Sequence, residues 1–217
     1  MLTLCREQSS VPSSPATLPQ LADDIVKIIC ALSITPPIHA LIGVSQGGAT
    51  TLAFSLVHST LAKKYVVCDT QAVSPPANSK AWDERIALAR EKGMTALAEV
   101  TVPRWFPSRS EFRADGRRSA FIHDMIMGTP VEGFVVGARA LQGYDLSLGL
   151  AESLKGKEIL FIAGERDGAL PGVLKELSAK LAGEGVAASI EIIEGCGHLP
   201  MVDGTKEWLD VVEKFLS

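Results

Sequence analysis

The chain has 217 residues, of which 47% are hydrophobic, a size that allows one substantial core and is small for two domains. A formal net charge of −4, with no uncharged apolar stretch of about 18 residues, argues against nucleic-acid and membrane partners. The four cysteines have neither zinc-site spacing nor the density of a secreted disulfide scaffold, so we expect a cytoplasmic protein without a metal site. From the length we expect a single domain over residues 1–217.

The N-terminal part of the chain predicts a loop, a helix and a strand, in that order. Three prolines among serines indicate an extended loop over residues 9–19. Apolar side chains then recur at steps of three and four from Leu18 to Leu32, which is typical of an amphipathic helix. The apolar run at residues 38–42 predicts a strand, and residues 47–59 predict the next helix.

Three further apolar runs, at residues 65–68, 158–163 and 189–193, also predict strands. Helical patterns at residues 173–181 and 206–216 alternate with them. Strands that are apolar along their whole length and alternate with helices are typical of a parallel sheet covered on both faces. We therefore predict an α/β fold with a mostly parallel sheet and helices on both of its faces.

A long insertion separates the second predicted strand from the third. It far exceeds the crossover of roughly 12 residues that is enough to join parallel strands. It contains helical patterns at residues 82–89, 94–100, 121–127 and 131–141. We expect residues 75–148, approximately, to form a helical cap that shapes a pocket over the carboxyl edge of the sheet and excludes water.

The sequence GVSQGG at residues 43–48 joins the first predicted strand to the helix that follows it. In this G-x-S-x-G pattern a sharp turn lifts a serine oxygen above the sheet, and glycines flank the serine because side chains would collide there. The alternative is an ordinary tight turn between a strand and a helix. Ser45 is the candidate nucleophile, and the backbone N–H of Gln46 is the candidate oxyanion donor.

Two later loops supply the other groups that nucleophilic acyl transfer needs, an imidazole base and a carboxylate that orients it. Asp167 follows the strand predicted at residues 158–163, and His198 lies in a glycine-rich loop after the next strand. A lone aspartate there is usually a turn residue or a helix cap, and a lone histidine in a glycine loop is usually just exposed. Serine, acid and histidine in this order, each after a strand, favour a Ser45–His198–Asp167 triad over those readings.

Other residues compete for these two roles. Glu165 is the competing acid, but Asp167 has the better position in its loop. The other histidines, at positions 39, 58 and 123, fall in a predicted strand, a helix and the insertion, so none fits the role of the base.

The G-x-S-x-G turn at residues 43–48, called the elbow below, and the loops IAGERD (162–167) and GCGHLP (195–200) resemble the α/β-hydrolase superfamily. The insertion narrows the resemblance to the 3-oxoadipate enol-lactonase group. The similarity covers nearly the whole chain from about Leu18. In the insertion it is carried by Asp69-Thr70, Trp82 with Arg85, Gly93-Met94, Arg104-Trp105-Phe106 and residues 129–134.

The resemblance implies hydrolysis of a small enol-lactone or ester substrate without a cofactor. Because the lactone carries a carboxylate, a cation that faces the pocket makes physical sense. The resemblance therefore assigns Arg104 and Trp105 to the substrate pocket. The alternative, equally supported, is that Trp105 belongs to the core of the cap and Arg104 is a surface cation.

The sequence departs from the superfamily pattern at its N-terminus. The strands that normally precede the elbow, and a His-Gly turn that supplies one oxyanion amide, have no counterpart, so we expect an N-terminally shortened fold. The nucleophile strand would then have an unpaired edge, unless residues 2–5 or a second copy in a homodimer covers it. Two functions remain beside enol-lactone hydrolysis: an esterase or lactonase for another small substrate, and a catalytically impaired hydrolase fold that serves as a binding protein.

Overall fold

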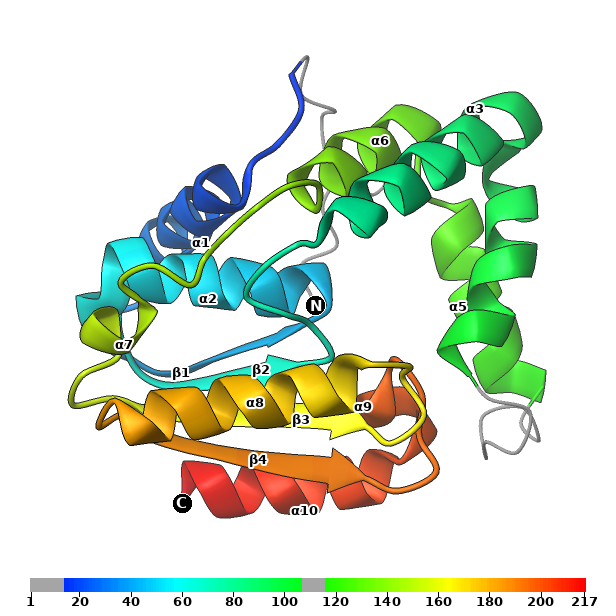
Figure 1. The fold of residues 1–217 in the computed structure, drawn as a ribbon. Coiled ribbons are helices and arrows are strands. Elements are labelled where there is room, and N and C mark those ends of the chain that lie inside the picture. Colours follow the sequence, from blue (N-terminus) through cyan, green and yellow to red (C-terminus); the bar gives the residue numbers. More distant parts are fainter. Residues whose placement is uncertain (1–13, 107–115) are drawn as a thin grey trace.

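The computed structural model describes residues 14–106 and 116–217 and contains a parallel sheet of four strands (Figure 1). The strands pair side by side in their sequence order. Each of the four apolar runs identified in the sequence lies within one strand, which confirms the predicted α/β sheet. The strands are β1 (Ile38–Val44), β2 (Ala62–Cys68), β3 (Glu158–Gly164) and β4 (Ala187–Ile193).

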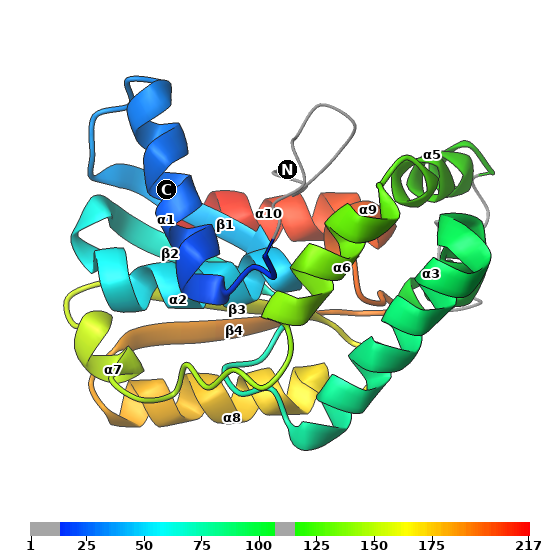
Figure 2. The same ribbon diagram turned by 90° about the horizontal axis from the view of Figure 1, so that it is seen from above.

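Helices cover both faces of the sheet, as predicted (Figures 1 and 2). On one face, α1 (Leu18–Ala31), α2 (Gln46–His58) and α8 (Leu170–Gly183) share a hydrophobic cluster with Tyr65 of β2 and Phe161 of β3. On the other face, α10 (Thr205–Leu216) packs against Val66 and Ile162. Successive residues of a strand point to opposite faces, so β2 and β3 must be apolar at every central position. Their central residues are accordingly buried.

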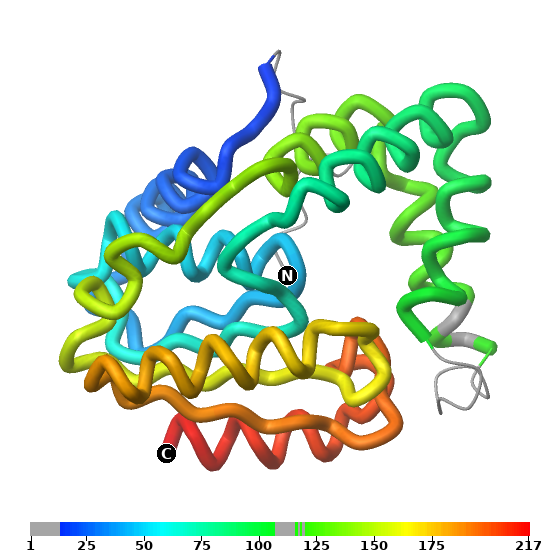
Figure 3. The backbone as a smooth tube through the Cα atoms, viewed as in Figure 1, coloured from blue at the N-terminus to red at the C-terminus, as the bar shows by residue number. Residues whose placement is uncertain are grey.

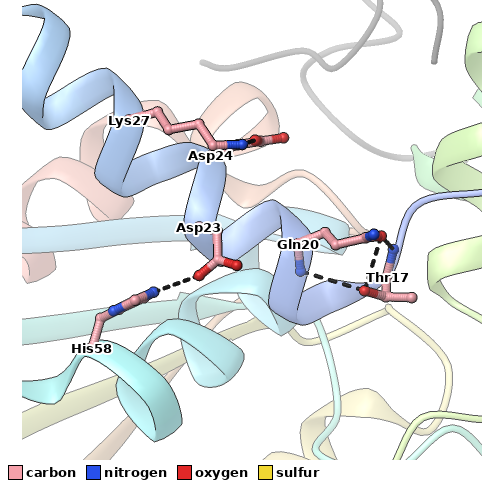
Figure 4. Close-up of polar contacts among 6 residues, drawn as sticks. All are labelled: Thr17, Gln20, Asp23, Asp24, Lys27 and His58. Carbon is pink, nitrogen blue, oxygen red and sulfur yellow. Dashed lines mark hydrogen bonds and ion pairs between the residues drawn. The ribbon is translucent and has the colours of Figure 1, made fainter.

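The first helix begins at Leu18, where the apolar pattern predicted it, so the last two residues of the predicted loop belong to the helix. Thr17 and Gln20 form a capping box, in which the Gln20 N–H donates to the Thr17 hydroxyl and the Thr17 N–H donates to the Gln20 side chain (Figure 4). Pro19 therefore lies inside α1, at a position in the first turn where the missing N–H costs nothing. Asp23 of α1 also contacts His58 Nε2 at 2.7 Å, which links α1 to the end of α2.

Within its described residues, the insertion forms three cap helices, α3 (Pro76–Trp105), α5 (Gly116–Met127) and α6 (Val131–Ala140). All four strands point toward the side on which these helices lie (Figure 1). The two helical segments expected before residue 101 belong to α3, which changes direction at Gly93, where φ is 80° (Figure 3). The cap helices bury apolar clusters of their own, one of which joins Val102, Phe106 and Ile122.

Short helices complete the connections: the 3-10 helix η1 (Ser59–Leu61), α7 (Leu150–Ser153) and α9 (Pro200–Asp203). In the part of the chain that the structure describes, no helix is both long enough and apolar enough to cross a membrane.

Strand β1 lies at one edge of the sheet and, within the described ranges, pairs only with β2. Its side chains are half-buried or exposed, whereas every residue of β3 after Glu158 is buried. Ile42 in particular is 42% exposed. The expectation that residues 2–5 pair with this edge concerns a segment outside the described residues.

Candidate active site

The turn between β1 and α2 carries Ser45 in an unusual backbone conformation, with φ 54° and ψ −118°. A non-glycine residue rarely adopts a positive φ, and such conformations are stored where the surrounding structure enforces them. A Cβ atom added to Gly43 would lie 2.1 Å from the Gly47 carbonyl oxygen, and one added to Gly48 would lie 2.9 Å from the Cys68 carbonyl oxygen. Glycine is therefore required at both positions by close backbone approach.

The expected collision at Gly47 is not found. A Cβ atom on Gly47 would meet no described atom within 4 Å. The turn is crowded at Gly43 because the backbone of Gly47 crosses it, but Gly47 itself faces the open side of the turn.

The structure brings Ser45, His198 and Asp167 together at the carboxyl edge of the sheet. His198 Nε2 lies 2.9 Å from Ser45 Oγ, and His198 Nδ1 lies 2.6 Å from Asp167 Oδ2. His198 and Asp167 are 7% and 9% exposed, so water screens their interaction weakly. This arrangement can pass a proton from the serine hydroxyl to the imidazole, while the carboxylate holds the imidazole in the tautomer with a proton on Nδ1.

The backbone around the site holds the two loops in position. The His198 N–H donates to the Trp105 carbonyl oxygen at 2.9 Å, which ties the histidine loop to the end of α3. A Cβ atom on Gly164 would lie 2.0 Å from the Gly197 carbonyl oxygen, so the loop after β3 and the histidine loop pass in direct contact.

The competing residues lie elsewhere. The Glu165 carboxylate accepts a hydrogen bond from the Gly195 N–H at 2.8 Å, on the exposed side of the loops. His39 contacts the Leu216 carbonyl oxygen, His58 contacts Asp23, and His123 lies on α5.

Gln46 is the first residue of α2, so its backbone N–H has no acceptor within the helix. The positive end of the helix dipole makes such an N–H a suitable donor to a developing oxyanion. The Ser45 N–H cannot serve, because it donates to the Cys68 carbonyl oxygen at 2.9 Å. The Gln46 side chain reaches away from the turn and donates to the Gly137 carbonyl oxygen of α6 at 2.6 Å.

Trp105 lies both in the apolar cluster of the cap and beside the histidine of the site. Its half-buried ring packs with Ile126 and Leu199 in the cap cluster around Phe106. The same ring stacks on the His198 imidazole, with centroids 5.8 Å apart and an interplanar angle of 27°. Trp105 Nε1 is buried and has no hydrogen-bond partner within the described ranges, which leaves a donor available beside the imidazole.

Arg104 is exposed, but its guanidinium lies close enough to the site for its surroundings to change its pKa. Partial desolvation lowers the pKa of Arg104, repulsion from Arg85 lowers it further, and attraction to Asp167 acts in the opposite direction. Arg85 is half-buried above the ring of Trp82, at 4.7 Å from the ring centroid. Neither arginine forms an ion pair within the described residues, so Arg104 lies near Asp167 without a carboxylate bound to it.

Asp69, which carries no assigned role in the sequence analysis, is the unexpected member of the site. It follows β2 directly, is 1% exposed, and has a φ of 47°. Its Oδ1 accepts a hydrogen bond from the Gly164 N–H at 2.9 Å. Burial, and after it the proximity of Asp167, raises the pKa of the Asp69 carboxyl to about 9, while the hydrogen bond from Gly164 acts in the opposite direction.

The side chains of Asp69, Asp167 and His198 offer oxygen and nitrogen atoms that all lie within 4.8 Å of one another. Among the described residues this is the one group with the spacing of metal ligands. The 2.6 Å contact with Asp167 already occupies His198 Nδ1, and Nε2 contacts Ser45. Both ring nitrogens thus serve the serine and the aspartate, which is the arrangement of a proton relay and not of a metal centre.

A separate cleft of about 250 Å³ lies between α1 and α6, and its lining includes Gln20, Lys27 and Val136. None of Ser45, Asp167 and His198 lines it. We therefore do not assign it to this site.

Residues 8–211 match a sequence profile described as the Alpha/beta hydrolase family. The chain belongs to this family. This confirms the fold that the elbow and the two loops indicated, with a parallel sheet between helices.

Three known proteins are similar to this alpha/beta hydrolase over nearly its whole length. The 3-oxoadipate enol-lactonase 2 of Acinetobacter baylyi is 26% identical over 96% of this chain and 74% of its own length. The crystal structure of an enol-lactonase from Burkholderia xenovorans is 27% identical, with a TM-score of 0.82, over 97% of this chain and 77% of that one. An esterase structure from Thermogutta terrifontis, 24% identical, shares the fold with a TM-score of 0.86 over 98% and 77% of the two chains.

Proposed function

We propose that this alpha/beta hydrolase is a serine hydrolase that opens a small lactone or ester bearing a carboxylate, with 3-oxoadipate enol-lactone as the leading substrate. The observation that carries the proposal is the continuous contact from Ser45 Oγ through the His198 ring to Asp167. The names of the Acinetobacter and Burkholderia relatives support the choice of an enol-lactone.

In this mechanism His198 Nε2 takes the proton of Ser45 as the serine oxygen attacks the lactone carbonyl. The carbonyl oxygen becomes an oxyanion, which the Gln46 N–H stabilises at the N-terminus of α2. Collapse of the tetrahedral intermediate breaks the ring C–O bond, and the departing enol oxygen receives the proton from His198. Water, deprotonated by the same imidazole, then hydrolyses the acyl-serine ester and restores the serine.

A cation near the site that forms no ion pair within the described residues supports a substrate that carries a carboxylate. Arg104 feels the charge of Asp167 and therefore lies within electrostatic reach of the reacting groups. A guanidinium binds a carboxylate through two parallel hydrogen bonds, which orients the substrate as well as attracting it. We assign Arg104 to the substrate carboxylate and the Trp105 ring to the wall of the pocket beside His198.

The test compares hydrolysis of 3-oxoadipate enol-lactone and of a neutral short-chain acyl ester by the wild type, Ser45→Ala and Ser189→Ala. Ser189 is an exposed serine of β4 and provides the matched control. We expect turnover of the lactone by the wild type and the control, and loss of at least about 10³-fold in Ser45→Ala. Full activity of Ser45→Ala would overturn the proposal, and faster turnover of the neutral ester would favour a different small substrate.

A catalytically impaired hydrolase fold that acts as a binding protein is the second candidate. Loss of one oxyanion donor lowers turnover by about 10²–10³ and leaves the serine activated. Folded wild-type protein that neither turns over any ester nor reacts with a fluorophosphonate would favour this candidate.

A further inference from the structure

The Asp69 carboxyl group lies against the acid of the site and has no role in the mechanism above. It comes from the end of β2, whereas Asp167 comes from the loop after β3, so neighbouring strands bring the two groups together. Oxygen atoms of both carboxyls lie within 4.8 Å of each other and of a His198 ring nitrogen. Asp69 Oδ2 is buried and has no donor within the described residues.

Two carboxyl groups this close together in a buried site favour one bound proton, because two negative charges would repel each other and lose hydration. We assign the negative charge to Asp167 and the proton to Asp69. Its Oδ2 receives the Nδ1 proton of His198, and it feels the positive charge of Arg104. Asp69 Oδ1 accepts a hydrogen bond from the Gly164 N–H, whereas Oδ2 has no hydrogen-bond donor among the described residues, so the proton belongs on Oδ2.

We propose that Asp69 keeps its proton and donates it from Oδ2 to the Asp167 carboxylate, as a positioning residue for the Asp167–His198 pair. This inference rests on the proposed function only for its kinetic part. The hydrogen bond limits the rotation of the Asp167 carboxylate, and through it the orientation of the imidazole toward Ser45.

The backbone of Asp69 agrees with a role in placing this carboxyl. Its φ of 47° is a conformation that aspartate and asparagine tolerate better than most residues. Its N–H donates to the Ile162 carbonyl oxygen at 2.9 Å, which continues the β2–β3 pairing by one residue. The Gly164 N–H occupies Oδ1, so Oδ2 is the oxygen left to interact with the nearby Asp167.

Protonation is tested first without any substrate. In wild-type protein labelled with ¹³C at the aspartate carboxyl, NMR at pH 7 is expected to show one aspartate with the chemical shift of a neutral acid. That signal is expected to be missing in Asp69→Asn. A spectrum at pH 7 in which every aspartate is ionised would overturn the proposal whatever the catalytic activity.

The positioning role is tested with Asp69→Asn and Asp69→Ala, both checked for native folding by circular dichroism. Asparagine is neutral and retains a donor, whereas alanine removes it. We expect kcat/KM, or the rate of fluorophosphonate reaction with Ser45, to stay within about 3-fold in Asp69→Asn and to fall about 10- to 100-fold in Asp69→Ala.

The pH profile separates this role from a purely structural one. Asparagine replaces a neutral acid without changing the charge beside His198, so the acid limb of the profile should keep its midpoint. A midpoint moved to lower pH in Asp69→Asn would mean that a negative charge had been removed, and it would overturn the proposal. Equal losses in both variants would also contradict it. An inactive wild type with the neutral-acid signal present would count against the proposed function alone.

Discussion

The side chain of Gln46 donates a 2.6 Å hydrogen bond to the carbonyl oxygen of Gly137, so the residue after the candidate nucleophile is tied to cap helix α6. The same residue offers its backbone N–H to the oxyanion. One residue therefore connects the position of the cap with the geometry of the reacting centre.

Replacing Gln46 with alanine removes this tie and keeps the backbone N–H. The Gly137 carbonyl oxygen then loses its side-chain donor, and we expect the free energy of unfolding to fall by about 1–2 kcal/mol. We also expect KM to rise more than kcat falls, because the oxyanion donor remains. Urea unfolding and steady-state kinetics measure the two effects. A large loss of kcat with unchanged KM would show instead that the side chain acts on the transition state.

The two glycines that flank Ser45 are expected to differ sharply in their tolerance of alanine. A Cβ atom at position 43 meets the Gly47 carbonyl oxygen at 2.1 Å, so Gly43→Ala must displace backbone and should destabilise the fold by about 3 kcal/mol or more. Gly47→Ala meets no described atom within 4 Å, and helix propensity favours it by up to about 1 kcal/mol. Urea unfolding of this matched pair checks the difference. Equal destabilisation by both substitutions would contradict the described turn.

The contribution of Asp69 to the free energy of unfolding is expected to fall as the pH rises from about 4 to about 9. Its folded-state pKa of about 9 lies above the ordinary value of 3.8, so the folded state retains a proton that the unfolded state releases. The associated stability is fully present below pH 4 and is lost as the pH rises through 9, with a slope of at most about 1.4 kcal/mol per pH unit.

Comparison with Asp69→Asn isolates this contribution from all other titrating groups. The wild type should lose stability relative to the variant between pH 5 and pH 9, measured by chemical denaturation. Parallel pH profiles for the two proteins would show that Asp69 ionises normally in the folded state.

Arg104→Met is expected to raise KM for an anionic lactone by about 10- to 100-fold, since a charged hydrogen-bonded pair with the substrate is lost. KM for a neutral ester should change little. Arg90→Met is the control, because Arg90 forms an exposed ion pair with Glu132 on the cap and such pairs contribute little. A similar rise in KM for both substrates would assign Arg104 to the structure of the cap.

Much of the site could be predicted because its groups directly follow apolar strands. Ser45, Asp167 and His198 each stand after a run that reads as a buried strand, and parallel strands bring their carboxyl ends to one edge. The kink in α3 was harder to place, because it depends on the backbone conformation of Gly93, which apolar periodicity does not report.

Asp69 could not be assigned a role from the sequence. An aspartate after a strand usually reads as a turn residue, and its contact with Asp167 depends on a parallel pairing between strands far apart in the chain. The stacking of Trp105 on His198 is likewise tertiary, because the insertion folds back over the sheet only in three dimensions. At the elbow, the prediction that a side chain on Gly47 would collide is wrong. The G-x-S-x-G pattern does not report which glycine is crowded, because that depends on the path of the backbone.

The central claim is that His198 activates Ser45 as a nucleophile. The most direct test is reaction of the purified protein with a fluorophosphonate, followed by mass spectrometry of the labelled peptide. The account predicts one equivalent of label on Ser45 in the wild type and in Ser189→Ala, and a rate at least about 10²-fold lower in folded His198→Ala. Label on another residue, or an unchanged rate in His198→Ala, would contradict it.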